Sequence, residues 1–135
     1  MAFDIACFPG KSENQWAYVL LHFQPRNVYV FKGGLWATPF DDAIEVATAE
    51  DIPGTLVLLA PPDGKNYQGS TDLNSFAHPE ECCYIFGHDT ESLSSGEMGE
   101  RDPDHSVYVE TDTVDKMWSW VAAAVTLYDR RSKGG

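Results

Sequence analysis

The chain has 135 residues and a formal net charge of −12 at pH 7. Its length predicts one domain, residues 1–135, and its 43% hydrophobic content excludes an intrinsically disordered class. No apolar run reaches the roughly 18 residues of a membrane span, and so acidic a chain is a poor candidate for strong autonomous RNA binding, which depends on basic surface.

The N-terminal residues 1–5 lack the basic and apolar regions of a signal peptide, so the cytoplasm is the expected location. Cys7, Cys82 and Cys83 each lie in an apolar run and are expected to be reduced and buried. Because neighbours on a strand point to opposite faces, Cys82 and Cys83 are poor disulfide partners.

The first part of the chain predicts a strand, a helix and a second strand. Residues 1–8 read as a strand that Pro9-Gly10 ends. Ser12 and Gln15 have the form of a capping box, so we expect a helix from about Ser12 to Gln24-Pro25. Its apolar stripe consists of Trp16, Val19, Leu20 and Phe23. Residues 27–31 form the next strand, and this order predicts a parallel pair.

The middle of the chain is less regular. Residues 41–50 fit either a short helix or an edge segment, whereas residues 54–60 form a continuous apolar run typical of a buried strand. Residues 65–76 read as a polar loop, with one helical turn at 71–76. Residues 96–104 are acidic and without periodicity, and we expect a mobile loop there.

The last part of the chain predicts two more strands and a long helix. The strands cover residues 82–86 and 106–110, and the helix covers 115–131. Together these elements predict an α/β sandwich with a mostly parallel sheet. The last helix is apolar nearly all round, so a second surface must cover it beside its own sheet, and a dimer partner is the simplest cover.

Four motifs, which follow one another along the chain as they do in a known family, resemble the motifs of that family. Residues 85–94 read IFGHDTESLS and resemble the motif F-G-x-E-x-x-S/G-L of the SpoU-like branch of the SPOUT RNA methyltransferases. Residues 121–131 are similar to the last helix of that branch, which reads like V-A-A-A-I-L-L-Y-E-R. The strand and the lead-in that precede the F-G-x-E motif in the family match residues 57–60 and 73–79. The family's opening P-x-x-x-x-N matches residues 8–14.

The resemblance implies a three-layer α/β domain with a C-terminal trefoil knot, which acts as a homodimer through its last helix. It also implies S-adenosylmethionine as the cofactor, held largely by backbone groups of three loops. The expected cofactor-binding residues are Leu59, Ala60, Phe86, Gly87, His88, Asp89, Val109, Thr111, Met117 and Trp118. Gly87 suits this role because a residue without a side chain lets the backbone approach a flat ring.

The chain departs from the family at functional positions. The family motif N-x-G-x-x-x-R, counted from Asn14, places Trp16 at the glycine and Leu20 at the catalytic arginine. In the closing motif S-L/M-N, Trp118 stands where the family has asparagine, and Asp89 replaces the glutamate of the middle motif. Asn14 remains a candidate catalytic residue, and Arg26, which follows the same helix, is the candidate substitute for the arginine.

Two function classes follow from these patterns. The first is an S-adenosylmethionine-dependent methyltransferase of tRNA or rRNA that acts on a ribose 2′-hydroxyl. The second is a dimeric binding or regulatory protein that keeps the fold without the chemistry, which the loss of the arginine and the charge of −12 favour. A small-molecule or protein substrate is a third alternative. The spacing of histidine and cysteine does not match a tetrahedral metal site, so no metal is expected.

Overall fold

The computed structural model describes residues 2–8, 12–31, 42–60, 70–87, 98–112 and 117–134. Its elements in chain order are β1 (Phe3–Cys7), α1 (Glu13–His22), β2 (Val28–Phe31), β3 (Ile44–Val46), the 3-10 turn η2 (Ala49–Asp51), β4 (Leu56–Ala60), β5 (Thr71–Asp72), the 3-10 turn η3 (Leu73–Ser75), β6 (Cys82–Ile85), β7 (His105–Tyr108) and α3 (Ser119–Ser132). Neither described α-helix has the length and apolar character needed to cross a membrane.

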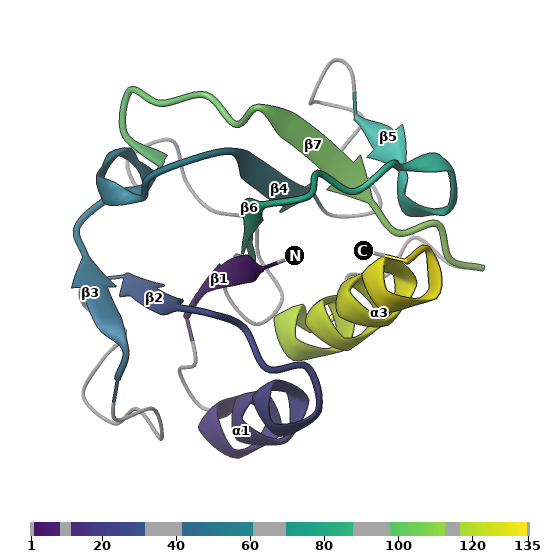
Figure 1. The fold of residues 1–135 in the computed structure, drawn as a ribbon, viewed down its shortest axis with the longest axis horizontal. Coiled ribbons are helices and arrows are strands. Elements are labelled where there is room, and N and C mark those ends of the chain that lie inside the picture. Colours follow the sequence, from purple (N-terminus) through teal and green to yellow (C-terminus); the bar gives the residue numbers. More distant parts are fainter. Residues whose placement is uncertain are drawn as a thin grey trace.

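The strands form one sheet in the order β3-β2-β1-β6-β4-β7-β5, and every described pairing is parallel (Figure 1). The predicted parallel pair of β1 and β2 is confirmed, with Ile5 opposite Val28. Since all strands run the same way, the sheet has one edge where every strand begins and one where every strand ends. We call these the amino edge and the carboxyl edge.

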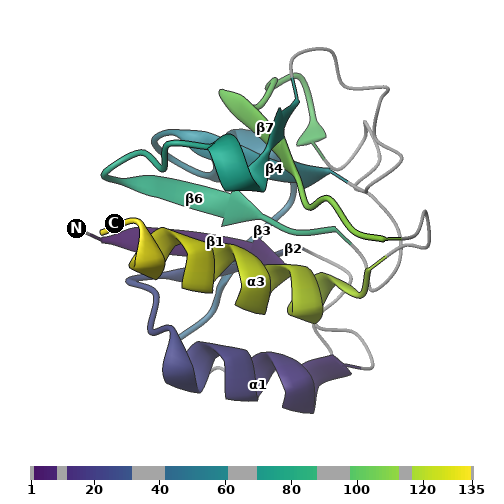
Figure 2. The same cartoon turned by 90° about the vertical axis from the view of Figure 1, so that its right-hand side faces the viewer.

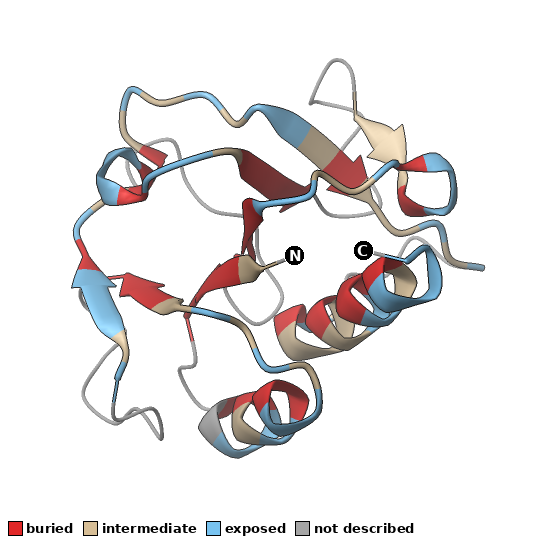
Figure 3. Cartoon of the chain, in the orientation of Figure 1, coloured by how far each residue is buried: buried red, intermediate tan, exposed pale blue. Residues whose placement is uncertain are grey.

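Alternate residues of the central strands enter two separate cores, as the period of a strand requires. On one face, Ile5, Val57 and Tyr84 pack with residues of α1 and α3. On the other face, Ala6, Leu58 and Ile85 pack with Ile52, which follows η2, and with Met98. Figure 3 shows that the buried residues concentrate in the inner strands and on the sheet-facing sides of the helices.

Both α-helices lie on the same face of the sheet, as Figure 2 shows, and they contribute to the same core. The second face is covered, within the described ranges, by η2 and the segment at Met98 instead of an α-helix. The α/β class with a mostly parallel sheet is therefore confirmed. The described residues do not test the expected third layer of helices or the trefoil knot.

Most predicted elements are present with shifted ends. Residues 44–46 form an edge strand, which selects one of the two readings left open for 41–50. The last helix begins at Ser119, because Trp118 has an extended backbone and is the N-cap residue. Ser12 is the N-cap of α1 without the predicted side-chain capping bond.

The expectation of a mobile loop at 96–104 is wrong for its described part. Met98 is buried in the second core, and the guanidinium of Arg101 donates hydrogen bonds to the backbone oxygens of Ile52 and Gly54. The carboxylate of Asp104 accepts a bond from the backbone N–H of Leu56 over 2.8 Å. These contacts join the segment to the start of β4, and they depend on residues far away in the chain.

The two isoleucines Ile5 and Ile44 allow a test of how much the buried core contributes to the free energy of unfolding. Ile5 is fully buried in β1, whereas Ile44 is exposed on the edge strand β3. We expect Ile5→Ala to lower the free energy of unfolding by about 2–5 kcal/mol, because the removed side chain leaves a cavity. The matched control Ile44→Ala should change it by less than about 1 kcal/mol. Urea unfolding measures both, and equal effects would contradict the described burial.

Candidate functional site

The sheet has a topological switch point between β1 and β6. These strands are neighbours, but the chain leaves β1 toward β2 on one side and leaves β6 toward β7 on the other. In open parallel sheets, ligands bind outside the carboxyl ends of the strands at such a point. The candidate site therefore lies at the carboxyl edge, beside the ends of β1 and β6.

The chain at the end of β6 is held tightly. The backbone N–H of Phe86 donates to the oxygen of Ala6 over 2.9 Å, which continues the pairing of β6 with β1. Phe86 and Gly87 are both buried, and the indole of Trp16 meets the Phe86 ring edge-on with 5.5 Å between centroids. Because glycine has no side chain, a ligand beside Gly87 would meet the N–H and C=O groups of the backbone.

The predicted cofactor residues follow the carboxyl ends of neighbouring strands. Leu59 and Ala60 end β4, Phe86 and Gly87 follow β6, and Val109 follows β7. The sheet order places β6, β4 and β7 side by side, so the topology brings these three chain segments to one edge. Sequence analysis grouped them only through the family resemblance, whereas the sheet order groups them on physical grounds.

The remaining predicted cofactor residues have different surroundings. Thr111 and Met117 are partly buried, and Trp118 keeps 47% of its surface exposed directly before α3. The indole is thus not inserted into either core. His88 and Asp89 lie outside the described residues.

The structure separates the two candidate catalytic residues. Asn14 is exposed in the first turn of α1, and this helix begins after the carboxyl end of β1. Arg26 lies two residues before β2, at the amino edge. Its guanidinium donates to the carboxylate of Asp4 over 3.1 Å and to that of Glu81 over 2.8 Å. The structure therefore brings Asn14 to the same edge as the cofactor residues, but it does not bring Arg26 there.

The position of the missing arginine is part of the core. Leu20 is only 9% exposed and packs in the core of the helix-covered face together with the fully buried Trp16. An arginine at position 20 would need partners for a buried charge. The two departures from the family motif, Trp16 and Leu20, therefore have the same structural role, which is to fill the space between α1 and the sheet.

The described part of the carboxyl edge offers few groups that could bind a phosphate. Its described residues are mostly apolar, and the arginines of the chain lie elsewhere, at the amino edge or near the end of α3. Among the described residues, three buried polar side-chain atoms have no hydrogen-bond partner. Trp16 Nε1 and Ser119 Oγ lie in the first turns of α1 and α3, and Thr126 Oγ1 lies further along α3. Such orphaned groups are rare in folded proteins, and they fit a site that receives a polar ligand.

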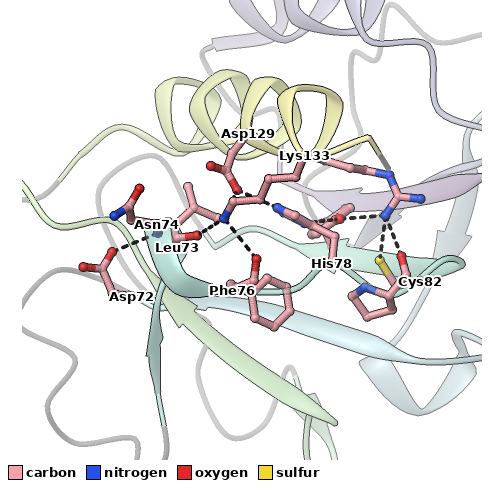
Figure 4. A network of polar contacts seen from close by, with 11 residues as sticks. Asp72, Leu73, Asn74, Phe76, His78, Cys82, Asp129 and Lys133 are labelled. Atoms are coloured by element: carbon pink, nitrogen blue, oxygen red, sulfur yellow. Dashed lines mark hydrogen bonds and ion pairs between the residues drawn. The ribbon is translucent and has the colours of Figure 1, made fainter.

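A second polar cluster at the amino edge was missed by sequence analysis. Asp129 Oδ2 lies 2.7 Å from His78 Nε2 and 2.8 Å from Lys133 Nζ, and Lys133 also donates to the backbone oxygens of Leu73 and Phe76 (Figure 4). His78 Nδ1 lies 2.7 Å from the hydroxyl of Tyr84. This cluster joins the end of α3 to the chain before β6. Its only signal in the sequence is the i, i+4 spacing of Asp129 and Lys133.

The contacts of the cluster fit a neutral His78. Arg130 Nη1 donates to Tyr84 Oη over 2.9 Å, so the hydroxyl proton of Tyr84 is available to His78 Nδ1, while Nε2–H donates to Asp129. Burial lowers the pKa of His78, against the effect of Asp129. Burial raises the pKa of Asp129, but the hydrogen bonds from Lys133 and His78 outweigh this and lower it.

Comparisons with known proteins support the fold. By sequence, the chain matches no protein-family model, and no curated protein is significantly similar to it. By structure, it matches a protein from Neisseria gonorrhoeae grouped with the methylase family, with a TM-score of 0.73, 13% identity, and 98% of this chain and 81% of that chain covered. The chain therefore has the fold of the SpoU methyltransferases, as the family resemblance implied.

Two further structures carry more specific names. An rRNA methyltransferase from Sinorhizobium meliloti matches with a TM-score of 0.69 and 11% identity, over 97% of this chain and 56% of that one. The SpoU methyltransferase AviRb from Streptomyces viridochromogenes, in complex with the cofactor AdoMet, matches with a TM-score of 0.66 and 14% identity, over 99% of this chain and 57% of that one. The chain thus spans little more than half the length of these two proteins.

The amino-edge cluster predicts a loss of stability on acidification. The pKa of His78 is lower in the folded chain than in the unfolded chain, so the unfolded state binds the proton more readily. Its contribution is present above the unfolded pKa of about 6.5 and is lost as the pH falls through the folded value. The lowered pKa of Asp129 adds a loss of the same sign at lower pH.

We therefore expect His78→Gln to lose less stability than the wild type between pH 8 and pH 5.5. The glutamine amide can replace both hydrogen bonds but does not titrate in this range. Each unit by which the pKa of His78 is lowered corresponds to about 1.4 kcal/mol. Urea unfolding at both pH values measures the effect, with His22→Gln on the exposed face of α1 as the control. The same pH dependence in wild type and His78→Gln would contradict it.

Proposed function

We propose that the chain is an S-adenosylmethionine-dependent methyltransferase that acts on a ribose 2′-hydroxyl of tRNA or rRNA. The observation that carries this proposal is the mostly apolar carboxyl edge at the switch point, in a fold shared with a SpoU methyltransferase that has been seen with AdoMet. The cofactor would supply an electrophilic methyl group, which passes from sulfur to the ribose oxygen as the hydroxyl proton is released to solvent.

The residues of the carboxyl edge would hold the adenosyl group. Gly87 would let the backbone approach the adenine ring, and the apolar side chains of Leu59, Phe86 and Val109 lie in neighbouring segments of this edge. Met117 and Trp118 would bound the pocket from the start of α3, where the half-exposed indole offers a flat apolar surface. Most of the rate enhancement would then come from positioning.

Asn14 would orient the ribose hydroxyl. Its amide is exposed at the start of α1, on the edge where the cofactor residues lie, and an amide can both donate to and accept from a hydroxyl. Arg26 is a weaker candidate than the sequence suggested, because its guanidinium is engaged by Asp4 and Glu81 at the amino edge.

The second candidate function is a binding or regulatory protein without methyl transfer. It is favoured by one structural observation, the packing of Leu20 and Trp16 in the core where the family motif has arginine and glycine. In this alternative, the carboxyl edge still takes a nucleoside ligand but has no group that activates a hydroxyl.

We also propose that the chain carries the trefoil knot that the family resemblance implies and that it forms a homodimer. Both helices expose large apolar side chains although they cover the same face of the sheet. The exposed side chains are Tyr18 and Leu21 on α1, Trp118 before α3, and Val125 and Tyr128 on α3. Surfaces of this kind mark interfaces, and α1 and α3 pack on the same face of one sheet.

The cofactor proposal is tested by calorimetric titration with S-adenosylmethionine and S-adenosylhomocysteine. We expect one site per chain with a micromolar dissociation constant. With radiolabelled cofactor and tRNA or rRNA, Asn14→Ala should lower methyl transfer by about tenfold or more without changing cofactor binding, because it affects only the alignment of the hydroxyl.

The outcomes separate the two functions. Cofactor binding without transfer to any RNA would contradict the methyltransferase proposal and favour the binding protein. A chain that binds neither cofactor nor product, alone or with RNA, would contradict a nucleoside site at the carboxyl edge.

The dimer proposal predicts that Tyr128→Glu shifts the chain toward monomers. A carboxylate at the centre of an apolar interface loses its hydration, so we expect the dimer dissociation constant to rise by about tenfold or more. Sedimentation velocity over a concentration series measures this. The control is Ile44→Glu, which also replaces an exposed apolar side chain but lies on the edge strand β3. A monomeric wild type, or an equal effect of both variants, would contradict the proposed interface.

A further inference from the structure

Ser119 is the first residue of α3 and carries a buried hydroxyl without a partner. The residue is only 5% exposed, and none of the described residues provides a hydrogen-bond partner for its Oγ. A hydroxyl removed from water without a hydrogen bond destabilises the folded state. A ligand that supplies the missing partner would remove that penalty.

The position of Ser119 indicates where the partner would lie. In an α-helix, each Cα–Cβ bond tilts toward the N-terminus, so the side chain of a first residue lies beside the start of the helix. The helix starts after Met117 and Trp118, two of the expected cofactor residues, and runs back toward the amino-edge cluster at Asp129. The first turn of α3, which contains Ser119, therefore lies at the carboxyl edge.

The start of α3 favours a negatively charged partner. The first N–H groups of a helix have no acceptor within the helix, and the helix dipole adds partial positive charge there. Trp118 is the N-cap residue and supplies no side-chain capping bond. Helix starts of this kind hold carboxylates and phosphates.

A carboxylate of a small ligand fits this place better than an RNA phosphate. Ser119 is buried, so a polynucleotide backbone on the surface would lie further from it than a small ligand held between the segments of the carboxyl edge. The chain has a net charge of −12, so it would repel a carboxylate that had no specific donors.

We propose that the hydroxyl of Ser119, with the first N–H groups of α3, binds the carboxylate of the amino-acid part of the cofactor. This rests on the proposed use of S-adenosylmethionine and adds a residue that the family motifs do not indicate. Ser119 is a binding residue, and it distinguishes ligands that carry an amino-acid carboxylate from those that end at the thioether.

Thr126 provides a matched control within the same helix. Its hydroxyl is also buried and without a partner, and it lies two turns further along the same buried face of α3. It is far from the start of the helix. Thr126→Val therefore removes an orphaned hydroxyl that the proposal does not place in the site.

The test compares S-adenosylhomocysteine with 5′-methylthioadenosine, which lacks the amino-acid carboxylate. We expect Ser119→Ala to weaken binding of S-adenosylhomocysteine by about tenfold, as for the loss of a hydrogen bond to a charged group. Binding of 5′-methylthioadenosine should stay within about twofold of wild type. Thr126→Val should leave both affinities unchanged. Ser119→Cys, which keeps the size of the side chain, should behave like Ser119→Ala because a thiol is a weak donor.

Each outcome has a distinct meaning. Ser119→Ala should melt at or above the wild-type temperature without ligand, since it removes an unsatisfied group. Equal binding of S-adenosylhomocysteine by wild type and both Ser119 variants would overturn the inference and leave the proposed function intact. An equal loss for both ligands would overturn the assignment to the carboxylate. No binding of either ligand by the wild type would overturn the proposed function together with the inference.

Discussion

The buried guanidinium of Arg130 determines where α3 lies on the sheet. The residue is 2% exposed and donates hydrogen bonds to the backbone oxygens of Pro79 and Glu80 and to the hydroxyl of Tyr84. It also lies over the ring of Phe3, 5.4 Å from the centroid. A buried charge is tolerated only where such partners surround it, so the end of α3 has one favourable position against β1 and β6. The neighbouring contacts of Asp129 and Lys133 reinforce that position.

This anchoring separates the two edges of the sheet. The amino edge holds the charged pairs of Arg26, Arg101 and Lys133, each directed at backbone or carboxylate groups of the chain itself. The described residues of the carboxyl edge are mostly apolar and include the buried Gly87 and the unpartnered hydroxyl of Ser119. Because the end of α3 is anchored at the amino edge, its first turn is held at the carboxyl edge. The contacts at the amino edge can therefore position the candidate site without forming part of it.

The core also bears on whether the site performs chemistry. Trp16 and Leu20 occupy positions where the family motif has glycine and arginine, and both belong to the core of the helix-covered face. In this chain, both positions contribute to the packing of α1 on the sheet. Catalysis in this chain would have to depend on alignment by groups such as Asn14, or the carboxyl edge serves binding alone.

Much of the architecture follows from the sequence by itself. The apolar runs and their turn residues predict β1, β2, β4, β6 and β7, because the period of a strand and the punctuation by proline and glycine are local properties. The motifs around Gly87 and in the last helix predict the methyltransferase fold, which the structural neighbours share. The tertiary structure decided what local patterns do not encode, namely which distant residues meet. It placed Arg26 beside Asp4 and Glu81 at the amino edge, buried Arg130 against β6, and left Ser119 without a partner among the described residues. These contacts depend on the order of the strands and on the position of α3 against the sheet.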